Sequence, residues 1–301
     1  MSISNCPDPA CSITSSRVLL KGEAAYMREG RSCRLSYDYR LCERCSLGFV
    51  HPMPAEEVIA CFYTGDYTYY QPAGQQPWTE AGSWKYRIAR RRYLGLLRPG
   101  AANGLASLFA ALAEFLARKS VTFTLGVPLA LPRDARILDY GYGTGSWLLA
   151  MRLSGYSRLL GWDIAANTER REELTAHGIE VVPPDGLDRL DAASLDCVRL
   201  EHVFEHLVEP LAALRSLYRL LKPGGLLVMT FPSIYPWLRV KDLAASPFLA
   251  HMQLPIHLRH HSIESSGKLL SAAGFETIAC RITVRERFIT LMARKPTEAG
   301  S

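Results

Sequence analysis

The chain has 301 residues, a formal net charge of +6 at pH 7, and ordinary fractions of apolar (48%) and charged (21%) residues. This composition excludes a disordered protein and is sufficient for one α/β domain with a second small module attached. The positive charge weakly favours anionic partners, and a solvated basic surface is a more frequent explanation of such a charge than a nucleic-acid groove. Residues 1–8 have neither the basic nor the apolar region of a signal peptide, so we expect a cytoplasmic protein.

Two close pairs of cysteines mark the N-terminal region. Four residues separate Cys6 from Cys11, two separate Cys42 from Cys45, and a strand-like stretch lies between the pairs. Because disulfides are rare in the cytoplasm, metal ligation or free thiols are the remaining uses. Two such pairs are typical of a tetrahedral four-sulfur zinc site with a structural role. Cys33 is an alternative ligand to Cys6 or Cys11, and scattered buried thiols are the alternative to a metal site.

The middle of the chain indicates a linker followed by a helical connector. Residues 71–82 are rich in Gln, Pro and Gly, whereas residues 84–97 and 105–116 carry apolar side chains at helical spacing. Charged residues interrupt the second helical segment, which favours a packed connector over a membrane span, with peripheral contact to a lipid surface as the alternative. We therefore predict three parts, at residues 1–70, 71–132 and 133–301.

A glycine-rich turn follows the first strand of the third part. The apolar run at 137–140 ends in Gly141, Gly143 and Gly145, and a helix opens at Ser146. Such glycines let the backbone turn sharply and let a ligand approach closely. About 20 residues on, Asp163 ends the next strand, where an acidic residue holds ribose hydroxyls. Strands alternating with helices predict a parallel sheet whose ligand crevice lies at the strand carboxyl ends.

This G-x-G-x-G pattern behind an acidic residue resembles motif I of the class I S-adenosylmethionine-dependent methyltransferases. The turn at residues 222–225 before an apolar strand is similar to the same superfamily. The resemblance implies a Rossmann-like α/β fold and S-adenosyl-L-methionine as the cofactor. The cofactor-binding residues that we predict on this basis are Asp139, Gly141, Tyr142, Gly143, Gly145, Asp163, Asp185 and Glu201.

The sequence around the second cysteine pair looks like the zinc-binding N-terminal module of a subset of these enzymes, which includes sugar C-methyltransferases. That resemblance implies a structural Zn²⁺ ion and a sugar-type acceptor, either a nucleotide sugar or a glycan. A tyrosine-rich segment of the module folds over cofactor and substrate in the subset, which makes Tyr67 and Tyr70 candidate substrate-binding residues, with packing as the alternative. The sugar C-methyltransferases carry a further C-terminal domain, whereas this chain ends soon after Ala293, so O-methylation of a glycan stays open.

Candidate catalytic groups follow the strand predicted at 195–200. His202 and His206 are four residues apart and would share a face if a helix begins here, with Glu205 beside them. A histidine oriented by a carboxylate is a general base near neutral pH, two imidazoles with a carboxylate can bind a divalent metal, and structural hydrogen bonding is the third alternative. In the resembling sugar enzymes the matching Glu-His pair is implicated in proton abstraction. We therefore predict His206 as the base, oriented by Glu205 and supported by His202.

A second histidine stretch precedes a helix that we expect to begin after Ser262 and to end at Gly274. The family has a similar H-x-x-H stretch, which implies that His257 and His260 line the acceptor pocket, with a structural role as the alternative. The sequence thus predicts a methyltransferase that acts on a sugar. Two alternatives are a nucleic-acid methyltransferase that uses the zinc module and arginines for phosphate contacts, and a non-catalytic scaffold that binds the cofactor.

Overall fold

The computed structural model describes residues 6–9, 11, 15–63, 131–153, 155–165, 168–240, 242–245, 249–282 and 287–297. The chain divides into two compact units, of which unit 1 combines Met1–Tyr67 with Leu190–Ser301 and unit 2 is Thr68–Arg189. Tyr67, Tyr70 and residues 71–130 of the predicted connector lie outside the described residues. None of the helices in the described part of the chain has both the length and the apolar character that crossing a bilayer requires.

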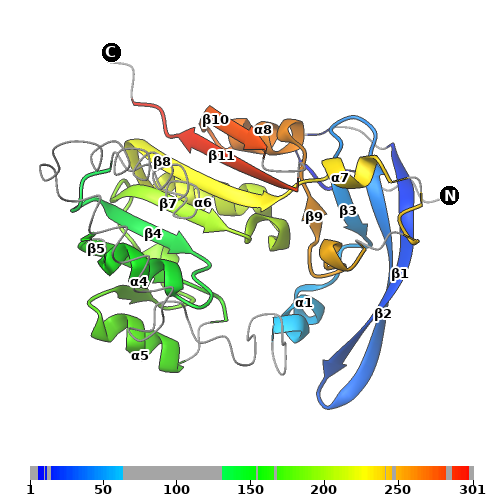
Figure 1. Ribbon diagram of the computed structural model, residues 1–301, viewed down its shortest axis with the longest axis horizontal. Helices are drawn as coiled ribbons and strands as arrows, with labels where there is room; N and C mark the ends of the chain where they lie inside the picture. Colours follow the sequence, from blue (N-terminus) through cyan, green and yellow to red (C-terminus); the bar gives the residue numbers. More distant parts are fainter. Residues whose placement is uncertain are drawn as a thin grey trace, which may run out of the picture. The chain divides into compact units, whose positions relative to one another are not determined.

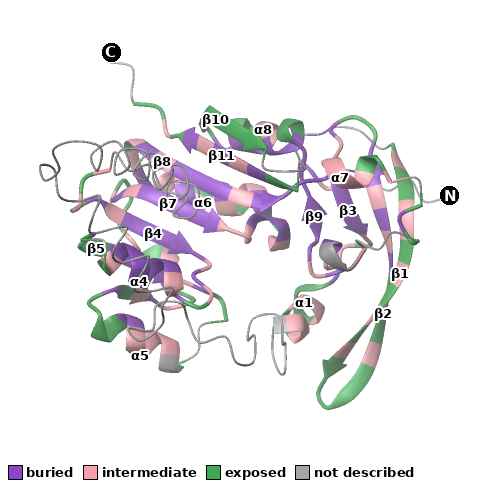
Figure 2. Cartoon of the chain, in the orientation of Figure 1, coloured by how far each residue is buried: buried purple, intermediate pink, exposed green. Residues whose placement is uncertain are grey.

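The N-terminal part of unit 1 is a four-stranded antiparallel sheet. Its strands lie in the order β1 (Ser16–Arg28), β2 (Arg31–Cys42), β3 (Gly48–His51) and β9 (Arg259–His260). Helix α1 (Glu56–Tyr63) follows β3 in the chain. The strands β1 and β2 form a long ribbon whose outer end is largely exposed (Figures 1 and 2). Strand β9 comes from a segment some 200 residues later in the chain than β3. The sheet therefore connects the N-terminal region with a segment from the second half of the chain.

Tight packing explains a glycine at the start of β3. A Cβ atom on Gly48 would lie 2.0 Å from the hydroxyl of Tyr39 and 2.5 Å from Ile234. Tyr39 and Ile234 belong to the apolar core of this sheet, which includes residues of α7 (Tyr235–Leu238) and its surroundings. Only glycine therefore lets β3 approach this core closely.

The C-terminal part of unit 1 holds four further strands in the order β10-β11-β8-β7. Strands β7 and β8 pair in parallel, and β11 pairs antiparallel to both β8 and β10. The bounds of the elements are β7 Leu195–Glu201, α6 Pro210–Leu220, β8 Leu221–Pro232, η3 Leu249–Met252, α8 Ile263–Ala272, β10 Glu276–Ile282 and β11 Phe288–Arg294. Proline at the first position of α6 fits the helix, since that residue needs no backbone donor.

The described part of unit 2 contains three parallel strands in the order β4-β5-β6, each separated from the next by a helix. The elements are β4 Arg136–Tyr140, α4 Ser146–Leu153, β5 Arg158–Trp162, α5 Thr168–Ala176, β6 Glu180–Val182 and the 3₁₀ turn η1 Leu187–Arg189. The buried faces of β4 and α4 form its core (Figure 2). This alternation confirms the predicted Rossmann-like α/β fold.

The condition for a helix face shared by His202 and His206 is not met. The stretch after β7 does not begin a helix but forms the 3₁₀ turn η2 (Phe204–His206), preceded by His202 at a φ of 54°. The helical spacing of His202 and His206 therefore does not place them on one helix face, and any proximity between them has another cause.

Candidate functional site

Four cysteines of unit 1 converge into one buried cluster. Their sulfur atoms all lie within 4.8 Å of one another, and the Cys6–Cys45 and Cys11–Cys42 sulfur pairs are both 3.8 Å apart. A zinc–sulfur bond of about 2.3 Å in a tetrahedron places two sulfurs about 3.8 Å apart, whereas a disulfide needs about 2 Å. The four thiols thus fit a tetrahedral metal site. Cys33 lies on β2 opposite Tyr26 and is not part of the cluster, which excludes it as the alternative ligand.

Backbone hydrogen bonds shape the turn that carries the second cysteine pair. The amide of Cys42 donates to the carbonyl of Leu47 at 2.9 Å, and that of Ser46 donates to Cys42 at 3.1 Å. The carbonyl of Cys45 accepts a buried hydrogen bond of 2.6 Å from the hydroxyl of Ser262, the N-cap of α8. The cysteine turn is therefore tied to the segment that carries His260 and His261.

The glycine turn of unit 2 has the backbone that its sequence requires. Gly141, Gly143 and Gly145 have φ angles of 81°, 51° and 69°, in the left-handed region that favours glycine. The turn lies at the carboxyl end of β4, which pairs in parallel with β5. Such a turn at the start of α4 can cradle a nucleotide-like ligand.

Asp163 meets this turn from the end of β5. One carboxylate oxygen accepts the amide hydrogen of Gly143 at 2.7 Å, and the other accepts that of Ala165 at 2.8 Å. These bonds fix the carboxylate beside the glycine turn, where each oxygen keeps a lone pair for a ligand hydroxyl. The predicted partnership between the glycines and Asp163 thus exists in the fold.

The remaining predicted cofactor residues differ in their surroundings. Asp139 and Tyr142 are buried in unit 2, and burial raises the pKa of Tyr142 to about 12. Asp185 is 69% exposed and pairs with Arg189. Glu201 belongs to unit 1, where its carboxylate lies 3.4 Å from Arg199 and 3.8 Å from His202.

A fully buried carboxylate lies at the centre of a histidine cluster in unit 1. Oε1 of Glu205 is 3.4 Å from Nδ1 of His202, 4.0 Å from Nε2 of His206 and 3.9 Å from Nε2 of His257. The His202 contact is too long for a well-formed hydrogen bond and becomes an ion pair only when His202 is protonated, and neither Glu205 oxygen has a hydrogen-bond partner among the described residues. His257, which the sequence assigned to the acceptor pocket, thus lies beside Glu205, one of the predicted catalytic residues.

The pKa values of the residues in this cluster are shifted in different directions. Burial raises the pKa of Glu205, but the surrounding histidines lower it more, to about 2. Burial lowers the pKa of His257 to about 2 and also lowers that of His206. For His202, burial lowers the pKa, but the Glu205 and Glu201 carboxylates raise it more, so the net pKa is above its ordinary value. The cluster therefore holds one ionised carboxylate among imidazoles of different basicity.

The neighbouring histidines are held by the N-terminal sheet. His260 is fully buried, and its Nδ1 is hydrogen-bonded to the hydroxyl of Tyr39 at 2.9 Å. His261 is also fully buried and stacks on Phe204. In this structure His260 has no exposed surface with which to line an acceptor pocket, because β9 places it inside the sheet.

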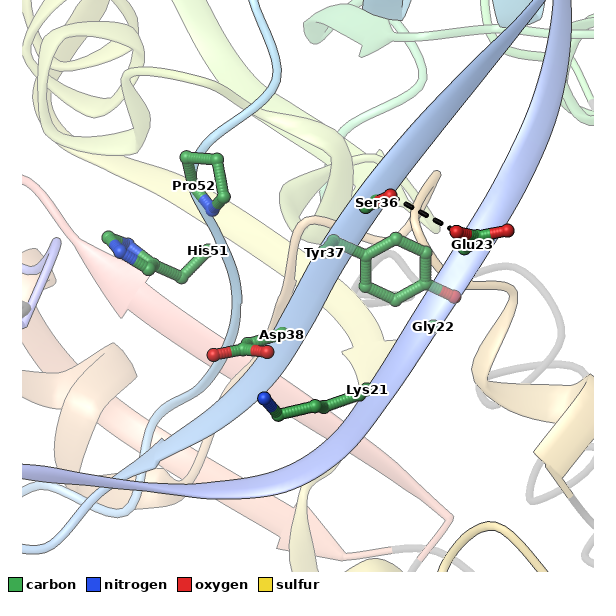
Figure 3. A pocket seen from close by; sticks show the side chains of 8 residues that line it. All are labelled: Lys21, Gly22, Glu23, Ser36, Tyr37, Asp38, His51 and Pro52. Atoms are coloured by element: carbon green, nitrogen blue, oxygen red, sulfur yellow. Dashed lines mark hydrogen bonds between the residues drawn. The ribbon is translucent and has the colours of Figure 1, made fainter.

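An open pocket of about 500 Å³ is lined by residues of β1, β2 and the end of β3 in the N-terminal sheet (Figure 3). Lys21, Asp38 and His51 are cross-strand neighbours on β1, β2 and β3 along its wall. None of the predicted site residues that the structure describes lines this pocket.

Comparison with known sequences assigns the chain to a family. The sequence profile of a family described as a methyltransferase domain matches residues 108–279, more than half of the chain. The chain belongs to this methyltransferase family. It is thus an enzyme whose fold is that of S-adenosylmethionine-dependent methyltransferases, and this confirms the family predicted from the glycine motif.

One curated protein and two solved structures illustrate what the chain is similar to. A protein of Streptomyces fradiae described as an uncharacterized 37.1 kDa protein in transposon TN4556 is 36% identical over 102 residues, which are 32% of this chain and only 29% of that protein. An S-adenosylmethionine-dependent methyltransferase structure from Mesorhizobium loti is 19% identical with a TM-score of 0.45, covering 59% of this chain and 97% of that one. A second from Methanosarcina mazei is 21% identical with a TM-score of 0.45, covering 56% and 95%.

Proposed function

We propose that this methyltransferase transfers a methyl group from S-adenosylmethionine to a hydroxyl of a sugar-type acceptor, either a nucleotide sugar or a glycan. The observation that carries the proposal is the Glu205–His202 pair at the carboxyl end of β7, the end at which parallel sheets bind ligands. A sugar hydroxyl is a poor nucleophile until a base removes its proton. The N-terminal cysteine module, which looks like that of sugar methyltransferases, supports the choice of acceptor.

The geometry favours His202 over His206 as the base. The side chain of His202 is 45% exposed, whereas that of His206 is 13% exposed. Nδ1 of His206 donates a hydrogen bond to the carbonyl of Ile256 at 3.1 Å, and its Nε2 faces the buried Glu205. His202 instead has Nδ1 toward Glu205, which leaves Nε2 on the side of Glu201 to accept a proton. Long contacts in such pairs are common before the substrate is bound.

Backbone strain at His202 is consistent with this role. Its φ of 54° lies in the left-handed region, where a residue other than glycine costs about 1–3 kcal/mol when the conformation is held by its surroundings. Its ring packs against Phe288 of β11 in a T-shaped arrangement, with the ring centroids 5.1 Å apart. Contacts on both sides thus hold the ring in place, so that proton transfer does not require the side chain to reorganise.

The cofactor fits the glycine turn of unit 2. When bound, S-adenosylmethionine supplies an electrophilic methyl group on a sulfonium sulfur. Asp163 would accept hydrogen bonds from its ribose hydroxyls, since the carboxylate is already oriented by the amides of Gly143 and Ala165. The glycines would let the backbone approach the cofactor more closely than any side chain permits.

The four cysteines would hold one zinc ion with a structural role. The sulfur spacing and the burial of all four side chains support a closed site. Because Cys45 bonds to the cap of α8, the ion would stabilise the sheet that carries His260. Zinc would thus act on the histidine cluster through the fold.

The test is a methyl-transfer assay with isotope-labelled S-adenosylmethionine. The purified full chain is incubated in parallel with a panel of nucleotide sugars, with oligosaccharides, and with mixed RNA and DNA. We expect label in a sugar fraction, lost in the His202→Ala variant. Label transferred to nucleic acid and to no sugar would overturn the choice of acceptor.

A further inference from the structure

Two histidines have no role in the proposed acid–base pair, although both face its carboxylate. The Nε2 atoms of His206 and His257 lie 4.0 Å and 3.9 Å from Oε1 of Glu205. Their rings meet edge to face, with centroids 4.8 Å apart. These separations are too long for hydrogen bonds, yet all three groups point to one space.

The carboxylate in this cluster is buried without the partners that a buried charge requires. Glu205 has no exposed surface, and both of its oxygens are without a hydrogen bond among the described residues. Nδ1 of His257 is likewise buried and makes no hydrogen bond within the described part of the chain. Burying an ionised carboxylate is costly unless a cation or several donors compensate it. A compensating group is thus expected next to Oε1.

The tautomer of His206 indicates that the compensating group next to Glu205 carries a positive charge. A carbonyl oxygen only accepts hydrogen bonds, so the contact between Nδ1 and the Ile256 carbonyl places the proton of the neutral ring on Nδ1. Nε2 then carries a lone pair directed toward the Glu205 carboxylate. Two electron-rich atoms that face one another at 4.0 Å repel unless a positive charge lies between them. A backbone carbonyl that orients the distal nitrogen is the usual support of a metal-binding histidine.

We propose that Glu205, His206 and His257 bind a divalent transition-metal ion such as Zn²⁺, Fe²⁺ or Mn²⁺, at a site separate from the four cysteines. Metal–ligand bonds of about 2.1 Å place ligand atoms between about 3 and about 4.2 Å apart, which includes the 3.9 and 4.0 Å separations from Glu205. Two imidazoles and one carboxylate select a transition metal over Mg²⁺ or Ca²⁺, which prefer oxygen ligands. The proposal concerns binding and does not depend on the acceptor.

Three protein ligands leave further coordination positions for oxygen ligands. His202 is not needed as a ligand, because its Nδ1 contact with Glu205 and its partly exposed ring suit the base. The metal and the base would therefore share only the Glu205 carboxylate. This arrangement gives a function to the buried His257 and to His206, which is 13% exposed, and neither histidine takes part in the proposed acid–base pair.

The test compares the metal content and spectra of the full chain. Protein reconstituted with Zn²⁺ and dialysed is analysed for metal, and protein reconstituted with Co²⁺ is examined by absorption spectroscopy. We expect about two ions per chain, one with thiolate-to-cobalt charge-transfer bands and one with the weaker bands of nitrogen and oxygen ligands. His206→Ala and His257→Ala should each lose the second signal and retain the thiolate bands.

The matched control is His177→Ala, which removes an exposed histidine of unit 2 and should retain both signals. Retention of the thiolate bands shows that each cluster variant is folded around the cysteine site. The wild-type chain alone can overturn the proposal: about one ion per chain, with thiolate bands only, would mean that a proton rather than a metal neutralises Glu205. Since no acceptor is used, this outcome is distinguishable from a failure of the proposed function.

Discussion

The glycine turn of unit 2 and the histidine cluster of unit 1 are built in different ways. The turn is a short contiguous stretch whose shape follows from three glycines at positive φ, completed by Asp163 from the next strand. The cluster combines η2 with a segment 50 residues further on, and its members meet around a buried charge. The turn therefore depends on local backbone conformation, whereas the cluster depends on the packing of distant segments.

This difference implies that a change that disrupts the structure of one region should leave the structure of the other intact. The N-terminal sheet holds the histidine segment through Tyr39, β9 and Ser262, all within unit 1. The glycine turn has its described contacts within unit 2. Damage to the cysteine cluster should accordingly remove turnover before it removes cofactor binding.

The largest effect is expected for Cys42→Ser. Loss of one thiolate should release the zinc, and apparent binding energies at such sites are about 10–16 kcal/mol, which is comparable to the stability of a whole domain. We expect loss of metal, unfolding of the N-terminal sheet by limited proteolysis, and loss of turnover, with S-adenosylhomocysteine still bound in calorimetry. Metal-free protein with an intact N-terminal sheet would contradict this expectation.

Gly143→Val should have the opposite effect, with cofactor binding lost and the zinc site retained. A β-branched side chain at a φ of 51° is strained and would occupy the space that the cofactor requires. We expect calorimetry to show S-adenosylhomocysteine affinity reduced by about 100-fold or more, with zinc retained. Gly155→Val is the matched control, because Gly155 also has a positive φ, of 92°, but has nothing within 4 Å of its Cβ position. Equal losses in both variants would assign the effect to backbone strain alone.

The contrast also explains what the sequence could predict. The glycine turn, Asp163 and the cysteine cluster follow from residue type and short spacing, and the structure brings them together. His202 and His206 do not share a helix face, because the chain forms a 3₁₀ turn at this point and not a helix. Placing His257 beside Glu205 requires knowing how β9 pairs with β3, and no local signal carries that information. The functions assigned to Tyr67 and Tyr70 stay predictions.

Within the histidine cluster, His202→Ala should lower turnover by about 10²–10⁴-fold, the usual contribution of a positioned general base. Binding of S-adenosylhomocysteine should change little. His51→Ala is a suitable control, because His51 belongs to β3 and lies outside the cluster. Full activity of the His202 variant, with a tenfold or greater loss in His206→Ala under metal-free conditions, would return the role of base to His206.

The pH profile of turnover gives a smaller but specific signature. His202 accepts a proton only in its neutral form, and the Glu205 and Glu201 carboxylates outweigh the effect of burial to raise its pKa above the ordinary value. In the metal-free enzyme the rate should therefore fall as the pH decreases, with a midpoint above about 6.5. A midpoint below that value, measured as kcat at saturating substrate, would fit a buried histidine with a lowered pKa instead.

The smallest effect is expected for Ser262→Ala, which tests the connection between the cysteine turn and the histidine segment. The Ser262 hydroxyl accepts the amide hydrogen of Ser265 at 3.0 Å as the cap of α8 and donates to the carbonyl of Cys45 at 2.6 Å. Loss of a helix cap costs about 1 kcal/mol, and the buried Cys45 carbonyl would lose its partner as well. We expect the urea midpoint to fall and the zinc to be released at lower chelator concentration. Ser271→Ala, at an exposed position of the same helix, should change neither. A lower urea midpoint with unchanged zinc release would show that Ser262 only caps α8, and that the cysteine turn is held independently of the histidine segment.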